Sequence, residues 1–260
     1  MRTLKLTIAY DGTRYAGWQV QRGQRTVQGT LEAALRRLLQ EPARIVASGR
    51  TDTGVHALAQ AAHLKTRSRL PERRLLMSVN QLLPGDIAVM AIESAPARFH
   101  ARFDARGKQY RYRIFTGPAV PPFIRPYVHH VRAPLNLAAM RRELRGLVGR
   151  NNFRAFSKTG RAPARRASQP GRAGRSTVRR VTRVSLVRAG DEIRLEIEGS
   201  GFLHLMVRSI AGTLIDVGRG RLPEGTVRRM LRRKDRRLAG TTAPGKGLAL
   251  VRVTYGKGGA

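Results

Sequence analysis

The apolar residues of this chain recur with two different spacings, which limits the folds that it can adopt. Leu4, Leu6 and Ile8 alternate with polar residues, as in a half-buried β-strand. Between Thr26 and Gln40 the apolar residues instead follow the spacing of one helix face. Segments of both kinds follow one another along the chain. This alternation predicts a mixed α/β fold of the α+β type.

The order of predicted elements is similar in the two halves of the chain. Further strands are predicted at 45–47, 55–64, 108–115, 178–187, 193–197 and 248–255, and further helices at 137–147 and 203–217. We therefore predict an N-terminal half at residues 1–106, which carries Asp52. The C-terminal half, residues 107–260, carries Tyr110, Arg208 and a basic loop near 160–176.

The chain carries far more positive than negative charge. It has 51 Lys and Arg against 16 Asp and Glu, a formal net charge of +35. Residues 144–190 contain no acidic residue, and a second basic cluster consists of Arg228, Arg229, Arg232, Arg233, Lys234, Arg236 and Arg237. Arginine holds phosphate oxygens with a planar, two-pronged donor set. Two basic segments with almost no opposing acids favour a nucleic acid as partner.

The composition also excludes several classes of protein. The absence of cysteine excludes disulfides, iron–sulfur clusters and thiol nucleophiles. No apolar run approaches the roughly 20 residues of a membrane span. The histidines lack the spacing of metal ligands, and no glycine-rich phosphate-binding motif occurs. We expect a soluble, cytoplasmic protein without metal, cofactor or membrane association.

Asp52 is the strongest candidate for a catalytic residue. It lies in a loop rich in small residues, between Gly49 and Gly54 and two positions after Arg50. The loop follows a short predicted strand, so these side chains emerge at one end of a sheet. The alternative is an Asx turn, in which the Asp52 carboxylate only accepts hydrogen bonds from nearby backbone N–H groups.

Two further side chains fit a site for nucleic acid. Tyr110 and Tyr112 share one face of a predicted strand with cations around them, which suits stacking of bases. The alternative, which we favour for Tyr112, is that a tyrosine fills the core. Arg208 lies among apolar residues of a predicted helix, and such a cation needs a partner. Asp52 is a candidate partner.

Five ordered motifs resemble the tRNA pseudouridine synthase A family. The most specific is Gly49-Arg50-Thr51-Asp52-Thr53-Gly54-Val55-His56-Ala57. The others are Tyr10-Asp11-Gly12 with Gly17-Trp18-Gln19, then Phe99-His100-Ala101-Arg102-Phe103 with Lys108 and Tyr110-Arg111-Tyr112, then Gly201-Phe202-Leu203 with Met206-Val207-Arg208, and Thr242-Ala243-Pro244 with Gly247-Leu248. The agreement extends over nearly the whole chain.

The resemblance implies a tRNA pseudouridine(38–40) synthase, an isomerase that converts uridine to pseudouridine in the anticodon stem-loop of tRNA. It implies a homodimer without cofactor or metal. The fold implied is that of pseudouridine synthases, with two similar halves, each a mostly antiparallel sheet flanked by helices, and a basic cleft between them. Asp52 would be the nucleophile and Tyr110 the aromatic partner of the target uracil. Arg208 would pair with Asp52, and Arg50 would help to position the flipped nucleotide.

The chain departs from the family pattern in two places. Asn151-Asn152 precede Phe153 where family members usually carry an acidic residue, and the loop from Arg161 to Ser176 is long and basic. Two other functions remain open from the residues alone. A non-catalytic RNA-binding protein would need the charge and the tyrosines but not Asp52. A nucleoside hydrolase or glycosylase would use the carboxylate but release the free base.

The basic loop generates a first prediction. If its arginines hold tRNA phosphates, replacing Arg161, Arg165, Arg166, Arg172 and Arg175 with alanine should flatten the salt dependence of tRNA affinity. Each arginine that no longer neutralises a phosphate should reduce the slope of log K against log salt by about 0.7 to 0.9. Filter-binding titrations at several salt concentrations measure the slope, and the single-turnover rate should hardly change. An unaltered slope would refute the role of the loop.

Overall fold

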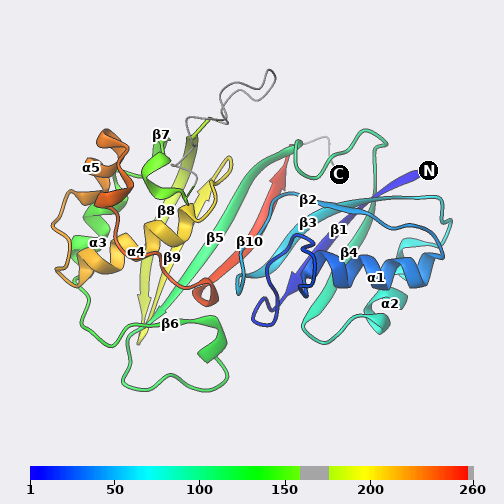
Figure 1. The fold of residues 1–260 in the computed structure, drawn as a ribbon, viewed down its shortest axis with the longest axis horizontal. Helices are drawn as coiled ribbons and strands as arrows, with labels where there is room; N and C mark the ends of the chain where they lie inside the picture. Colours follow the sequence, from blue (N-terminus) through cyan, green and yellow to red (C-terminus); the bar gives the residue numbers. More distant parts are fainter. Residues whose placement is uncertain (159–175, 257–260) are drawn as a thin grey trace. The chain divides into compact units, whose positions relative to one another are not determined.

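The computed structural model describes residues 1–158 and 176–256, and these form two compact units. Unit 1 comprises Met1–Arg111, Phe123–Tyr127 and Gly245–Ala260, and unit 2 comprises Tyr112–Pro122 and Val128–Pro244. Both units contain strands and helices, which confirms the predicted mixed α/β class (Figure 1). The predicted basic loop lies almost wholly outside the described residues.

The sheet of unit 1 is mostly antiparallel. Its strands are β1 (Arg2–Tyr10), β2 (Ile45–Ala47), β3 (His56–Thr66), β4 (Ile87–Ala95) and β10 (Leu248–Tyr255). Strand β1 pairs antiparallel with β3 and β4, and β2 pairs antiparallel with β3. Strand β10 runs parallel to β3, with Ala249 opposite His56. The closing strand of the chain thus lies beside the strand that leaves the Asp52 loop.

Two helices complete unit 1, α1 (Val27–Leu39) and α2 (Glu72–Leu82), which contact each other (Figure 1). Helix α1 begins where the Thr26 side chain accepts a hydrogen bond from the Gly29 N–H, which satisfies one free donor of the first turn. Its apolar face is buried, as the helical spacing predicts, and includes Leu31 and Leu35, both with no exposed surface.

Unit 2 combines antiparallel strands with three helices (Figure 1). Strand β8 (Val178–Ala189) pairs with β9 (Glu192–Gly199) on one side and β7 (Gly149–Asn152) on the other. The helices are α3 (Leu137–Leu144), α4 (Met206–Gly218) and α5 (Thr226–Arg233). Helix α4 is buried over almost its whole length and contacts both other helices.

Strand β5 (Ala105–Phe115) begins in unit 1 and ends in unit 2. Its last residues pair with β6 (His129–His130). The two units therefore do not correspond to two continuous halves of the sequence. The C-terminal segment, Gly245–Ala260, belongs to unit 1. The boundary at 106/107 stays a prediction.

Most predicted elements are present, but several observed ones, strand β7 among them, were not anticipated. The strands at 45–47, 178–187, 193–197 and 248–255 and the helices at 26–40 and 203–217 are confirmed to within a few residues. The helix expected at 137–147 ends at Leu144. Helix α2 and strand β4 had no counterpart among the predictions. Only Leu75 and Val79 of α2 are buried, so its apolar stripe is too short to give a clear helical period.

No helix in the described part of the chain is long and apolar enough to cross a membrane.

A buried glutamate joins two helices of unit 2. Glu143 of α3 is only 5% exposed, and its carboxylate accepts hydrogen bonds from the backbone N–H groups of Gly225 and Val227. These N–H groups lie at the first turn of α5 and have no partner within the helix. The negative charge also faces the positive end of the α5 dipole. Glu143 therefore supplies the cap that the α5 sequence lacks.

Glu143→Ala should destabilise the protein by about 1–3 kcal/mol, because it leaves buried N–H groups at the start of α5 without an acceptor. Glu224→Ala is the matched control, since it removes an exposed carboxylate that pairs with Arg142 at 2.6 Å. Exposed ion pairs contribute at most about 1 kcal/mol. Urea unfolding of both variants measures the free energies. Equal losses would contradict the capping role.

Candidate active site

Asp52 lies in the loop at residues 48–55, between β2 and β3, which we call the Asp loop. Its side chain is half-buried, whereas Arg50 is exposed. The Val55 N–H donates to the Asp52 carbonyl oxygen at 3.1 Å, which closes a turn after the aspartate. The structure thus places Asp52 at the end of a sheet, as the sequence predicts.

The first loop of the chain lies directly on the Asp loop. A Cβ atom on residue 12 would lie 2.1 Å from the Val55 carbonyl oxygen, and one on residue 17 would lie 2.6 Å from that of Thr51. Gly17 also has a φ of +91°, which favours glycine. The Trp18 N–H donates to the Thr51 carbonyl oxygen at 3.1 Å. Gly12 and Gly17 are therefore needed, because a side chain at either position would prevent the close contact between the two backbones.

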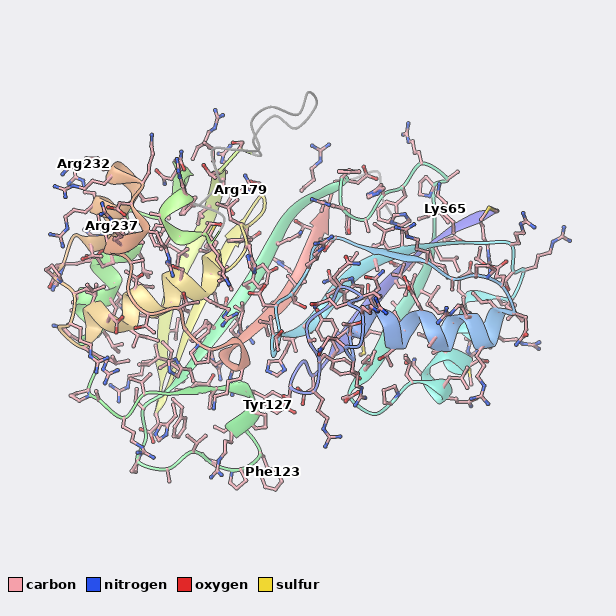
Figure 2. All side chains as sticks on the ribbon, in the orientation of Figure 1. Lys65, Phe123, Tyr127, Arg179, Arg232 and Arg237 are labelled. Atoms are coloured by element: carbon pink, nitrogen blue, oxygen red, sulfur yellow. The ribbon has the colours of Figure 1, made fainter. Side chains whose placement is uncertain are left out.

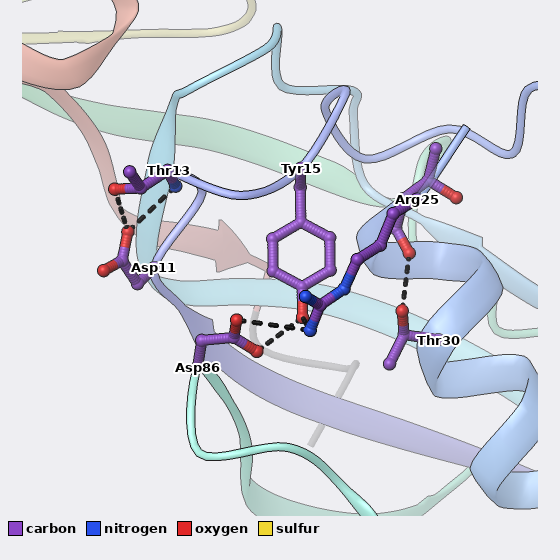
Figure 3. Close-up of polar contacts among 7 residues, drawn as sticks. Asp11, Thr13, Tyr15, Arg25, Thr30 and Asp86 are labelled. Carbon is purple, nitrogen blue, oxygen red and sulfur yellow. Dashed lines mark hydrogen bonds and ion pairs between the residues drawn. The ribbon is translucent and has the colours of Figure 1, made fainter.

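A cluster of aromatic and charged side chains anchors this first loop to Asp86, the residue before β4 (Figure 3). The buried Tyr15 hydroxyl donates to the Asp86 carboxylate, and Arg25 donates to both at 3.0 and 3.3 Å. The Arg25 guanidinium also lies 4.7 Å from the centre of the Tyr15 ring, a cation–π contact. Burial and the bond to Asp86 raise the pKa of Tyr15 to about 12. The anchor holds the loop in place against the Asp loop.

His56, the first residue of β3, connects three segments around the end of the Asp loop. Its Nδ1 accepts from the Gly12 N–H at 3.1 Å, and its Nε2 lies 3.1 Å from the Lys246 carbonyl oxygen. The carboxylate of Asp11 accepts from the Tyr127 hydroxyl at 2.9 Å, and the Tyr127 ring packs edge-on against His56. Segments from four regions of the sequence therefore meet at His56.

A buried polar network forms the floor of the Asp loop. Gln60 of β3 has no exposed surface; it accepts from the Ser48 hydroxyl at 2.8 Å and donates to the Gly49 carbonyl oxygen at 2.9 Å. The Tyr10 hydroxyl bonds to Thr51 Oγ1 at 2.8 Å. These buried polar groups satisfy one another, so the network fixes the loop at little desolvation cost.

Tyr110 lies near enough to Asp52 and Tyr10 for both to affect the electrostatics of its hydroxyl. It is 8% exposed, and burial raises the pKa of its hydroxyl, with further increases from nearby Tyr10 and Asp52. The hydroxyl therefore stays neutral at physiological pH. Tyr112, in unit 2, has no exposed surface, which confirms that it fills the core.

Lys108 belongs to one of the sequence motifs, but it was not predicted to be a residue of the site. It lies two positions before Tyr110 on β5, and its Nζ donates to the Ser48 carbonyl oxygen at 2.7 Å, at the start of the Asp loop. Burial, together with the positive charge of Arg102, lowers the pKa of its ammonium group to about 8. The spacing from Tyr110 places both side chains on one strand face, and this is the signal that could have identified it.

Arg208 belongs to unit 2, whereas Asp52, Arg50 and Tyr110 belong to unit 1. Arg208 lies near the start of α4 and is half-buried. Its Nε donates to the Ala243 carbonyl oxygen at 2.8 Å, and the Ala243 N–H donates back to the Arg208 carbonyl oxygen at 3.1 Å. The Tyr112 hydroxyl donates to the next carbonyl, that of Pro244, at 3.0 Å. The motif segments Met206-Val207-Arg208 and Thr242-Ala243-Pro244 thus meet within unit 2.

The described residues include no group of three His, Asp or Glu side chains placed to hold a metal ion.

Comparisons with known proteins identify a family and several relatives of this chain. A family model described as tRNA pseudouridine synthase matches residues 6–104 and 144–256. The tRNA pseudouridine synthase A of Pelobacter propionicus is 45% identical over 255 residues, which cover 98% of this chain and all of the relative. That of Ruminiclostridium cellulolyticum is 42% identical over 256 residues, with 98% and 100% covered. A solved archaeal box H/ACA Nop10–Cbf5 complex has a TM-score of 0.35 at 11% identity, covering 82% of this chain and 43% of that chain.

The family model and these relatives are all described as tRNA pseudouridine synthases, a class of RNA-modifying isomerases. The chain belongs to the tRNA pseudouridine synthase family, whose members isomerise uridine to pseudouridine in tRNA. The resemblance inferred from the sequence motifs is thereby confirmed.

The lowered pKa of Lys108 predicts a pH dependence of stability. In the unfolded chain a lysine titrates near pH ~10.4, so between about pH 8 and that value the unfolded state binds more protons than the folded state. The free energy of unfolding of the native protein should therefore rise with pH across this window relative to Lys108→Met, by at most about 3 kcal/mol. Urea unfolding at pH 7.5 and 10 measures the difference. Lys65→Met controls for the loss of one exposed positive charge (Figure 2). Parallel pH curves for native protein and Lys108→Met would contradict the prediction.

Proposed function

We propose that this protein converts uridine to pseudouridine at positions 38 to 40 of the tRNA anticodon stem-loop. The observation that carries the proposal is the half-buried Asp52, held in a loop that Gln60 and Tyr10 fix by hydrogen bonds and near enough to Tyr110 to affect its hydroxyl. Membership of the family supports the reaction. The positions and a homodimeric assembly are supported by the motif resemblance alone. A cytoplasmic location and a reaction without metal or cofactor are also what the composition and the lack of binding motifs lead us to expect.

The reaction exchanges one bond of the target uracil for another. The N1–C1′ glycosidic bond breaks, the base turns without leaving the site, and C5 bonds to C1′. The hydrogen on C5 is lost as a proton, and N1 gains one. Cleavage develops positive charge on the sugar, which an ionised carboxylate stabilises or traps. Asp52 is the group that we assign to this role, either by attack on C1′ or by removal of a 2′ proton.

The target base must leave the stacked anticodon arm to reach Asp52. Enzymes that act on a base extrude it and replace its former stacking with an aromatic side chain. Tyr110 is suited to this role because burial and its place on β5 hold its ring rigidly. We propose that Arg50, exposed two residues before Asp52, helps to position the extruded nucleotide.

We also propose that Arg208 pairs with Asp52 in the reacting complex. An arginine beside the carboxylate would keep it ionised, so that it could stabilise the positive charge that develops on the sugar. The hydrogen bond from Arg208 Nε to the Ala243 carbonyl oxygen supports the proposal, because it holds the guanidinium in a defined orientation.

The exposed cations of α5 are suited to hold the phosphates of the substrate. Figure 2 shows Arg232 projecting at the edge of unit 2. Two cations that follow α5 are bonded within unit 2. The Arg236 guanidinium donates to Ser209 and, at 2.7 Å, to Thr242, and Arg237 pairs with Asp235 at 2.8 Å. Arg236 is therefore used inside unit 2, and the basic cluster predicted from the sequence provides fewer free cations than its charge suggests.

Asp52→Asn should abolish the release of tritium from tRNA labelled at uracil C5, because no C5–C1′ bond forms without the carboxylate. The variant should still bind the same tRNA with nearly native affinity. Asp191→Asn, an exposed aspartate at the β8–β9 turn, is the matched control and should release tritium at the native rate. Absence of release from every tRNA by the native protein would disprove the proposed function. Release of free uracil would instead indicate a glycosylase.

A further inference from the structure

The loop before β5 forms an exposed aromatic platform on unit 1. Phe103 is 75% exposed, although it is a large apolar residue. One side of its ring packs on His100, with the ring centres 4.3 Å apart and the planes 30° apart. The Arg102 guanidinium lies 5.8 Å from the centre of the Phe103 ring, within the range of a cation–π contact. An open aromatic ring beside an arginine is thus presented to solvent.

This platform is held rigidly from below. The His100 ring packs on His63 at 4.8 Å, and His63 Nδ1 accepts from the Ala101 N–H at 3.1 Å. The Tyr255 hydroxyl donates to the Ala101 carbonyl oxygen at 2.8 Å. His100 Nδ1 also accepts from the N–H groups of Arg102 and Phe103, at 3.2 and 3.3 Å. The loop is fixed before any ligand binds. Stacking of a partner on Phe103 therefore costs little conformational entropy in the loop.

The platform is continuous with the candidate active site. Strand β5 starts at Ala105 and reaches Tyr110 five residues later, roughly 17 Å at about 3.3 Å per residue. Between them Lys108 holds the start of the Asp loop, and Arg102 is close enough to lower its pKa. The platform therefore lies at the distance of a few nucleotides from the target base rather than at the base itself.

We infer that Phe103 and Arg102 form a second base-binding site, on which an unpaired nucleobase of the RNA substrate stacks while the target uridine lies at Tyr110. The inference rests on the proposed function. Bases offer a π-face whatever their sequence, so an aromatic ring beside an arginine binds single-stranded RNA without reading its sequence. The net charge of +35 favours the same partner. The site suits substrates that differ in sequence around the modified position.

Binding of two RNAs by variants at Phe103 tests the inference. One RNA is an anticodon-arm hairpin with an unpaired loop, and the other is a fully paired duplex with the same number of phosphates. Phe103→Ala should weaken hairpin binding by about 5- to 100-fold and leave duplex binding unchanged, because paired bases are not free to stack. Phe103→Trp should retain native affinity. Phe123→Ala, at another exposed phenylalanine of unit 1 (Figure 2), is the matched control and should bind both RNAs as the native protein does.

The salt dependence separates the two residues of the platform. Phe103→Ala should keep the native slope of log K against log salt, because stacking releases no counterions, whereas Arg102→Ala should reduce it by about 0.7 to 0.9. Equal weakening for hairpin and duplex, or no weakening, would overturn the inference. So would a fall in molecular mass of Phe103→Ala on sedimentation, which would assign the ring to contact with a second copy. Tritium release by the native protein is measured separately, so a failure of the proposed function is recognised independently.

Discussion

The candidate site depends on backbone segments that approach one another without side chains between them. At Gly12 and Gly17 the first loop touches the carbonyl oxygens of Val55 and Thr51, at distances that no Cβ atom could share. The segment at residue 245 approaches the Thr53 carbonyl oxygen in the same way, where a Cβ would lie at 2.5 Å. The Asp loop is thus enclosed by backbone from distant parts of the sequence. Such packing fixes the position of Asp52 more closely than a mobile surface loop could.

The arginines of this chain serve two different physical purposes. Some are structural, as with Arg113, which donates two hydrogen bonds to Glu192 at 2.9 and 2.8 Å and lowers the pKa of that carboxyl to about 2. Others, such as Arg232 on α5, are exposed and available to a polyanion. The net charge alone does not separate these roles, because it counts a buried, bonded guanidinium and a solvated one equally. The separation needs the position of each side chain relative to its acceptors.

Much of the fold follows from local pattern. The alternation in β1 and the helical spacing of α1 each predicted the correct element, because one face of each packs on the core of unit 1. Helix α2 was not predicted, because only two of its side chains are buried and they give no clear helical period in the sequence. Lys108 and Gln60 were not identified as site residues for a different reason. Their importance comes from bonds to Ser48 and Gly49, and such long-range bonds leave no period in the sequence.

The sequence by itself determined the mixed α/β class, the excess of positive charge and, through ordered motifs, the family and the aspartate that we propose as its catalytic residue. These depend on composition and on residue order, which are local properties. Only the tertiary structure decided that Tyr110 is buried, that Arg236 is used internally and that Phe103 is open to solvent. Each of these properties depends on whether residues from distant parts of the chain contact the side chain or leave it exposed. Contacts of that kind are set by how strands and helices pack, and not by the residues next to them in the sequence.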